Sequence, residues 1–215
     1  MTRYRPFAVL ALAIGAVTGT ALTPQPSARA QSDDAAAQLA QVQAHLRGTT
    51  SMIAAFTQID RNGQRLTGTL TLKKPGKIRF QYQKGVPLLI VADGNSLTLI
   101  DYEVRQVQRW PVKNSPLSAL LDPDRNLASF AKLQPTRAPD VISVEVRDAK
   151  RPEYGMITLV FTRDGSAPAG LRLRGWVALD SQNNRTRIDL SDQRFNVAVA
   201  DSAFKWKDPR PVQRR

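Results

Sequence analysis

Short apolar segments separated by turn signals run from about residue 52 to residue 190, and this pattern most constrains the fold. Ile78, Phe80 and Tyr82 alternate with polar residues, as expected for a strand with one buried face. Asn62-Gly63 is a strong hairpin signal between two such segments. Many short strands with frequent turns indicate an antiparallel sandwich or barrel. We predict about ten strands, in the segments 52–60, 66–72, 78–82, 87–92, 97–99, 104–110, 141–146, 157–161, 171–177 and 185–190.

One helix is expected before the sheet. Leu39, Val42 and Leu46 recur at spacings of three and four within residues 36–49, which predicts an amphipathic helix. A helix beside a curled antiparallel sheet can cover its open face. Such an architecture can enclose an apolar ligand.

The middle of the chain interrupts the strand pattern. Residues 116–121 and 127–131 predict two short helices, and Ser115 and Asn126 are placed to start them. Strand signals resume only after Pro139. We therefore expect a short helical insertion that could act as a lid over the sheet.

The N-terminus has the features of a signal peptide. Arg3 and Arg5 precede an apolar run over residues 7–17, and Ala28-Arg29-Ala30 fits a cleavage site. The run is too short for a membrane span, which needs about 20 apolar residues. We expect cleavage of residues 1–30, export to the periplasm, and one domain of 185 residues over 31–215.

Composition narrows the possible partners. The chain has no cysteine, which excludes disulfides, a thiol nucleophile and the lipidated cysteine of a lipoprotein. Its net charge is +13, and +10 remains without Arg3, Arg5 and Arg29. Such a charge favours a polyanionic partner. Because the chain carries an export signal, we expect anionic headgroups or an acidic protein face and no nucleic acid.

Several segments, in this order, resemble the outer-membrane lipoprotein carrier (LolA) family. They run through nearly the whole expected mature chain and are densest between residues 52 and 122. The matching segments are Phe56-Thr57-Gln58, Gly68-Thr69-Leu70-Thr71-Leu72, Lys73-Lys74-Pro75-Gly76-Lys77-Ile78-Arg79-Phe80-Gln81-Tyr82, Val91-Ala92-Asp93-Gly94 with Leu97, and Ser115-Pro116-Leu117 with Leu120-Leu121.

The resemblance implies a mainly β fold, an incomplete, unclosed antiparallel barrel of about ten to eleven strands with helices forming a lid. It also implies a monomeric, non-enzymatic chaperone without cofactor. Such a chaperone takes lipidated proteins from an inner-membrane releasing complex to an outer-membrane receptor or the outer membrane. The candidate lining residues for acyl chains are Leu46, Met52, Ile78, Phe80, Leu89, Val91, Leu99 and Leu120. The same alternation would also fit a core that is simply filled.

The basic turn is the second candidate site. Lys73, Lys74, Lys77 and Arg79 could contact a partner or headgroups at the cavity mouth, or could form a solvated hairpin end. The resemblance implies a role in cargo retention and transfer for an arginine that often stands where this chain has Lys74. Lysine keeps the charge but lacks the planar fork of donors.

Other functions find little support in the sequence. His45 is the only histidine, and it is better explained by packing than as a general base. One histidine without cysteine cannot form the usual transition-metal cluster, so no metal site is expected. Three alternatives remain: a lipid- or glycolipid-binding periplasmic sensor or transporter of the same fold, a periplasmic hydrolase, and a basic envelope adhesin.

Overall fold

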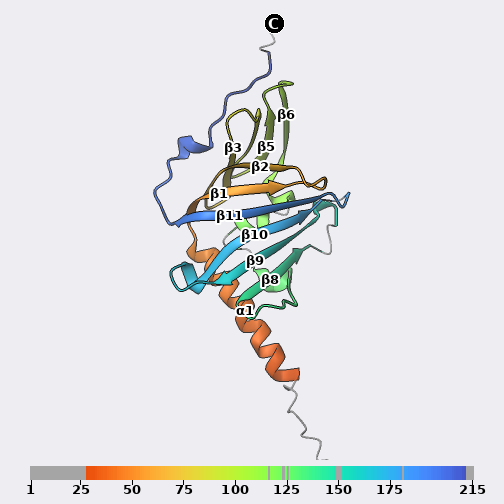
Figure 1. Cartoon of the computed structure of the whole chain (residues 1–215), viewed down its shortest axis with the longest axis vertical. Helices are drawn as coiled ribbons and strands as arrows, with labels where there is room; N and C mark the ends of the chain where they lie inside the picture. Colours follow the sequence, from red (N-terminus) through yellow and green to blue (C-terminus); the bar gives the residue numbers. More distant parts are fainter. Residues whose placement is uncertain are drawn as a thin grey trace, which may run out of the picture.

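The computed structural model describes residues 28–211 apart from 116, 123, 125, 149–151 and 181. In that part of the chain, eleven strands form one antiparallel sheet in the order β6-β5-β4-β3-β2-β1-β11-β10-β9-β8-β7 (Figure 1). The strands are β1 Ser51–Ile59, β2 Arg65–Lys73, β3 Lys77–Tyr82, β4 Leu88–Asp93, β5 Ser96–Asp101, β6 Gln106–Pro111, β7 Ala131–Gln134, β8 Val141–Arg147, β9 Met156–Arg163, β10 Leu171–Leu179 and β11 Arg185–Phe195.

The sheet is not closed into a barrel, as predicted. β1 pairs with β11, so the first and last strands lie at the centre of the sheet. β6 and β7 are its two edges, although they follow one another in the sequence. In its described residues, the segment that joins these edges carries three short helices, η1 Val112–Asn114, α2 Ser118–Leu121 and η2 Leu127–Ser129. The lid segment, residues 112–130, therefore lies where the barrel fails to close.

Turn chemistry explains the hairpin between β1 and β2. The Asp60 carboxylate accepts hydrogen bonds from the backbone N–H groups of Asn62 and Gln64, both at 2.8 Å. Gly63 has φ of 80°, a conformation that glycine adopts without steric cost. The predicted Asn-Gly turn is confirmed.

The N-terminal helix α1, Ala28–Gly48, is longer than predicted and begins eight residues before residue 36. Three of the eight added residues are alanines, Ala28, Ala30 and Ala35, and alanine favours helix without extending the apolar stripe. The expected signal peptide lies almost wholly outside the described residues. No helix in the described part of the chain is both long and apolar enough to cross a membrane.

The sequence predicted the middle of the chain less accurately. The Asn126 side chain caps η2 by accepting from the Ala128 N–H at 3.1 Å, as expected, but Leu117 rather than Ser115 precedes α2. The second helix ends at Ser129, and Ala131 already belongs to β7. β7 is an edge strand of four residues, too short to show a recognisable alternation. The remaining short helices are η3 Pro152–Tyr154, η4 Pro168–Gly170 and η5 Asp201–Phe204.

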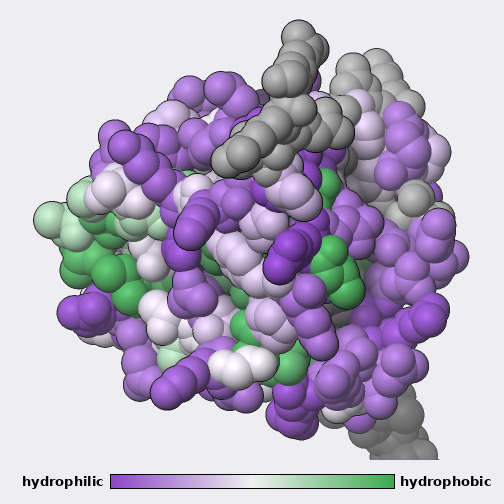
Figure 2. Space-filling view, turned by 90° about the horizontal axis from the view of Figure 1, so that it is seen from above, coloured by the Kyte–Doolittle hydropathy of each residue, from purple (hydrophilic) through white to green (hydrophobic). Residues whose placement is uncertain are grey.

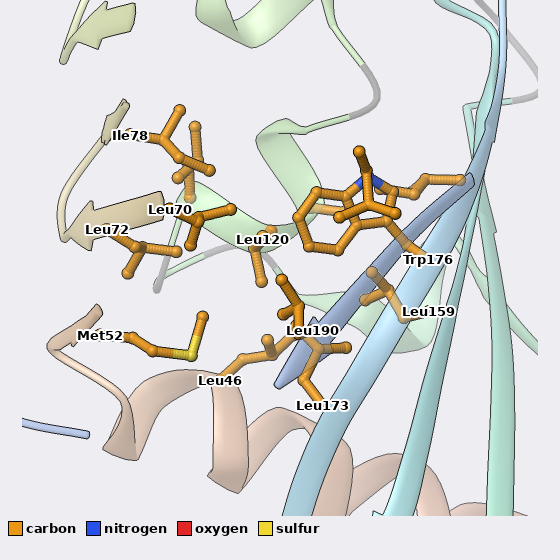
Figure 3. Close-up of a cluster of buried hydrophobic side chains, with 14 of the residues drawn as sticks. Leu46, Met52, Leu70, Leu72, Ile78, Leu120, Leu159, Leu173, Trp176 and Leu190 are labelled. Atoms are coloured by element: carbon orange, nitrogen blue, oxygen red, sulfur yellow. The ribbon is translucent and has the colours of Figure 1, made fainter. Parts of the chain in front are cut away.

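The main hydrophobic core lies on the inner face of the curved sheet. Side chains from β1–β3 face side chains from β9–β11, and Leu120 of α2 and Leu46 of α1 enter between them (Figure 3). Phe56 packs edge-to-face on Phe80 and Tyr82, each with ring centroids 5.3 Å apart. In this state, helices and aromatic side chains fill the space inside the fold.

Candidate functional site

Five of the eight candidate lining residues meet on the inner face. Leu46, Met52, Ile78, Phe80 and Leu120 are each at most 4% exposed and belong to one cluster. They come from the helices as well as from β1 and β3 (Figure 3). The helices therefore occupy the surface that an apolar ligand would contact.

Leu89 and Val91 lie on the opposite, outer face. They form a second cluster with Ile100 and Phe204, while the alternate residue Ile90 packs on the inner cluster. Their assignment to the inner lining is therefore corrected. Apolar and polar residues do not alternate along β4, so the sequence could not indicate which of its residues face inward.

Leu99 is half-buried and lies opposite Ile90 in the β4–β5 register. Opposite residues of an antiparallel pair share a face, so Leu99 belongs to the inner side. It lies near the open end of the sheet, two residues from the buried Leu97.

Two hollows flank the lid segment. One of about 410 Å³ lies between the edge of the sheet and the β10–β11 hairpin. It is lined by apolar Leu97, Trp110, Leu117, Tyr154 and Ala178, and by polar Ser115, Glu153, Asp180, Asn184 and Thr186. A second, of about 390 Å³, separates the basic turn from α2. In the view from above, the surface is mostly hydrophilic, and apolar side chains reach it only in patches (Figure 2).

Lys74 fastens the basic turn to α1. Its Nζ donates a hydrogen bond to the Leu46 carbonyl, in the last turn of the helix. Such a carbonyl lacks a partner within the helix and carries part of the negative end of the helix dipole. Burial lowers the pKa of Lys74 to about 8, against an opposing effect of Asp122 beside α2. Lys74 is thus a half-buried cation between helix α1 and the lid.

The other three cations of the basic turn hold the C-terminal strap, which we define as residues 197–206. Lys73 and Lys77 pair with Asp201 at 2.7 and 2.9 Å. Arg79 donates to the carbonyls of Ala203 and Lys205 at 3.3 and 3.0 Å. Hydrogen bonds from the two lysines lower the pKa of Asp201 to about 2. These three residues therefore bind the chain's own C-terminal segment, a contact that no sequence pattern indicates.

His45 is 1% exposed, and its Nδ1 lies 2.9 Å from the Pro168 carbonyl oxygen. Its ring packs edge-to-face against Phe161, with centroids 5.3 Å apart. Burial lowers its pKa. The packing interpretation of this histidine is confirmed. Within the described ranges, no group of three or more His, Cys, Asp or Glu could hold a metal ion.

Comparisons with known proteins agree with the fold. The profile of the family described as "Outer membrane lipoprotein carrier protein LolA" matches residues 47–207. Two proteins named outer-membrane lipoprotein carrier protein are each 27% identical to this chain. The one from Chromobacterium violaceum aligns with 82% of this chain and 86% of its own length. The one from Xanthomonas oryzae pv. oryzae aligns with 96% and 94%.

The crystal structure of the LolA superfamily protein NE2245 from Nitrosomonas europaea is also similar, at 12% sequence identity and a TM-score of 0.41. It covers 80% of this chain and 97% of that chain. The family profile spans most of the 215 residues, including β1 to β11 and the strap. The chain belongs to the LolA family of outer-membrane lipoprotein carrier proteins.

Proposed function

We propose that this protein is a periplasmic chaperone that binds the acyl chains of lipoproteins released from the inner membrane and delivers them to the outer membrane. One observation carries the proposal: the inner face of the unclosed sheet is apolar, and helices outside the sheet cover it. Its partners would be an inner-membrane releasing complex and an outer-membrane receptor or the membrane itself.

The lid segment can be displaced more easily than a strand. Its backbone is fixed to the rest of the fold at a few points, including Val112 N–H to Asn95 O at 2.9 Å and Gly76 N–H to Leu121 O at 3.0 Å. Leu127 N–H also donates to Gln43 Oε1 of α1 at 3.0 Å, and Leu120, Leu121 and Leu127 add apolar contacts with the inner cluster. Because apolar contacts are not directional, acyl chains can replace these leucines against the same sheet residues.

Energetics explain why the closed state is useful. Burial of an acyl chain of about 15 methylenes is worth roughly 12 kcal/mol, and several chains would approach the limit of non-covalent affinity. Each chain that enters must displace lid side chains that already cover the inner face. The net affinity for cargo is therefore the free energy of burying the acyl chains minus that of burying the lid side chains they displace. Because this difference is smaller than the burial of the acyl chains alone, a receptor can accept the cargo.

The test is mass spectrometry of the protein purified from periplasm under native conditions. We expect bound, intact lipidated proteins. Free lipids or glycolipids without lipidated protein would favour a sensor or transporter of the same fold. A ligand-free protein that also binds no hydrophobic fluorophore at micromolar concentration would contradict both.

A further inference from the structure

A basic groove crosses the outer face of the sheet, away from the strap. Its main part is a hollow of about 550 Å³ over β1 and β9–β11. A neighbouring hollow of about 340 Å³ at the β1–β2 and β10–β11 hairpins shares Arg185 with it. We call the two hollows together the arginine groove, after the arginines that line it, Arg61, Arg174, Arg185 and Arg187.

Strand alternation and a bulge build this groove. Ile188 and Leu190 of β11 point into the inner cluster, so Arg187, Asp189 and Ser191 point outward. The β9–β10 register shifts between Leu173 and Gly175, and such a bulge re-aims the side chains beside it.

Gly175 lies on the floor of the groove. A Cβ atom there would come within 2.0 Å of the Ile188 carbonyl oxygen, so only glycine fits this close approach. Without a side chain at this position, the floor is low, and the apolar Val160 and Val177 line it from either side. The groove is therefore apolar at its base and basic at its walls.

The cations of the groove outnumber its available anions. Arg174 and Arg185 are exposed and form no ion pair within the described part of the chain. Asp189 pairs with Arg187 at 2.8 Å. The Asp60 carboxylate already accepts the backbone hydrogen bonds of its own turn. Two guanidinium groups are thus open to a ligand, and their forked donors match carboxylates.

We propose that the arginine groove is a docking site for an acidic segment of a partner protein. This partner would be a protein that hands over or receives the cargo, an identification that rests on the proposed function. A protein segment fits better than a headgroup, because the floor offers apolar contacts and the groove lies behind the strands that carry Trp176 and Leu190 inward. A partner could bind there while the inner face holds cargo.

The test uses the exported protein and a fluorescein-labelled deca-glutamate peptide, with fluorescence anisotropy at low salt. The double variant Arg174→Gln/Arg185→Gln should bind at least about tenfold more weakly, because it loses two charge-assisted contacts. The matched control is Arg105→Gln/Arg137→Gln, which removes the same charge from two exposed arginines outside the groove. It should change the dissociation constant by less than about twofold.

Equal weakening in both double variants would overturn the proposal, because it would reflect net charge alone. So would failure of the peptide to saturate the parent protein. A third experiment measures binding to vesicles that contain phosphatidylglycerol. If Arg174→Gln/Arg185→Gln weakens binding to the vesicles but not to the peptide, the groove binds lipid and the proposal is wrong. In ¹H–¹⁵N spectra, peptide should shift the amide signals of Thr57, Gly175 and Ser191. The Arg174→Gln/Arg185→Gln variant should still bind a hydrophobic fluorophore, so loss of docking is separable from loss of the lipid site.

Discussion

The two faces of the sheet are covered in different ways. On the inner face, α1 and the lid segment bury a large cluster mainly through apolar contacts. On the outer face, the strap covers a small cluster around Leu89, Val91 and Ile100 through Phe204, and ionic and backbone hydrogen bonds fix its position (Figure 1). The lid segment therefore meets the inner face largely through apolar side chains, while α1 is also held by polar contacts, such as His45 Nδ1 at 2.9 Å from the Pro168 carbonyl oxygen and Gln41 Nε2 donating to the Ala169 carbonyl at 3.0 Å. The strap is fixed mainly by directional bonds.

This difference indicates which cover moves in function. Hydrogen bonds and ion pairs specify one partner geometry, so acyl chains cannot take the place of Asp201 or of the strap carbonyls. Leucine side chains specify only an apolar surface. We infer that cargo exchange takes place at the inner face and leaves the strap in place.

The largest expected effect concerns the hydrogen bond by which Lys74 of the basic turn is attached to α1. Lys74→Leu should keep the fold and accept lipoprotein, since it replaces a half-buried charge with an apolar side chain. Delivery should fail, or cargo should return to the inner membrane, because the bond to the Leu46 carbonyl is lost. Lys74→Arg should deliver at least as well as the parent. A reconstituted transfer assay decides, and normal delivery by Lys74→Leu would remove this residue from the mechanism.

The next effect is on stability and concerns the inner wall of the sheet. Leu159 is 0% exposed, so Leu159→Ala should lower the free energy of unfolding by about 3 to 4 kcal/mol through lost burial and a new cavity. Val104→Ala is the control, because Val104 is 64% exposed and should change stability by less than about 0.5 kcal/mol. Urea unfolding at neutral pH measures both. A loss below about 1 kcal/mol for Leu159→Ala would mean that the inner face is loosely packed without cargo.

The stability of the protein should depend on pH because Lys74, a half-buried cation beside α1, has a lowered pKa. The folded protein releases the Lys74 proton near pH 8, whereas the unfolded chain keeps it until about 10.5. Between these values the unfolded state binds more protons, so stability should rise with pH. From pH 8 to 9.5 the gain should be about 2 kcal/mol relative to Lys74→Met. Parallel curves for the two proteins in chemical denaturation would contradict this placement of Lys74.

The smallest stability effect should come from the outer cover. Phe204→Ala empties the outer cluster, but the strap can detach without unfolding the sheet. We expect a loss of about 1 to 2 kcal/mol, less than for Leu159→Ala. Proteolysis should become faster only beyond residue 196. A loss as large as that of the inner variant would make the strap part of one cooperative core.

The sequence predicted the fold where side chains alternate and failed where they do not. Residues 66–82 show a clear alternation, and β2 and β3 confirm it. β4 is apolar on both faces because the strap covers one of them, so Leu89 and Val91 could not be assigned a side. The strap carries apolar Val199, Ala203, Phe204 and Trp206, but at spacings that match neither a strand nor a helix, so their packing on the outer cluster follows only from the tertiary structure. The partners of Lys73 and Arg79 in the strap likewise lie more than 120 residues away in the sequence.

The central claim is that cargo replaces the inner cover and leaves the outer cover in place. Amide hydrogen exchange of the lid segment, residues 112–130, and of the strap, residues 197–206, measured with and without a tripalmitoylated lipopeptide, tests this most directly. Without lipopeptide, the lid segment should exchange faster than β2 and β3. With lipopeptide, its exchange should change several-fold while that of the strap stays the same. Equal protection of lid and strands without lipopeptide, or a change in the strap instead of the lid, would contradict the account.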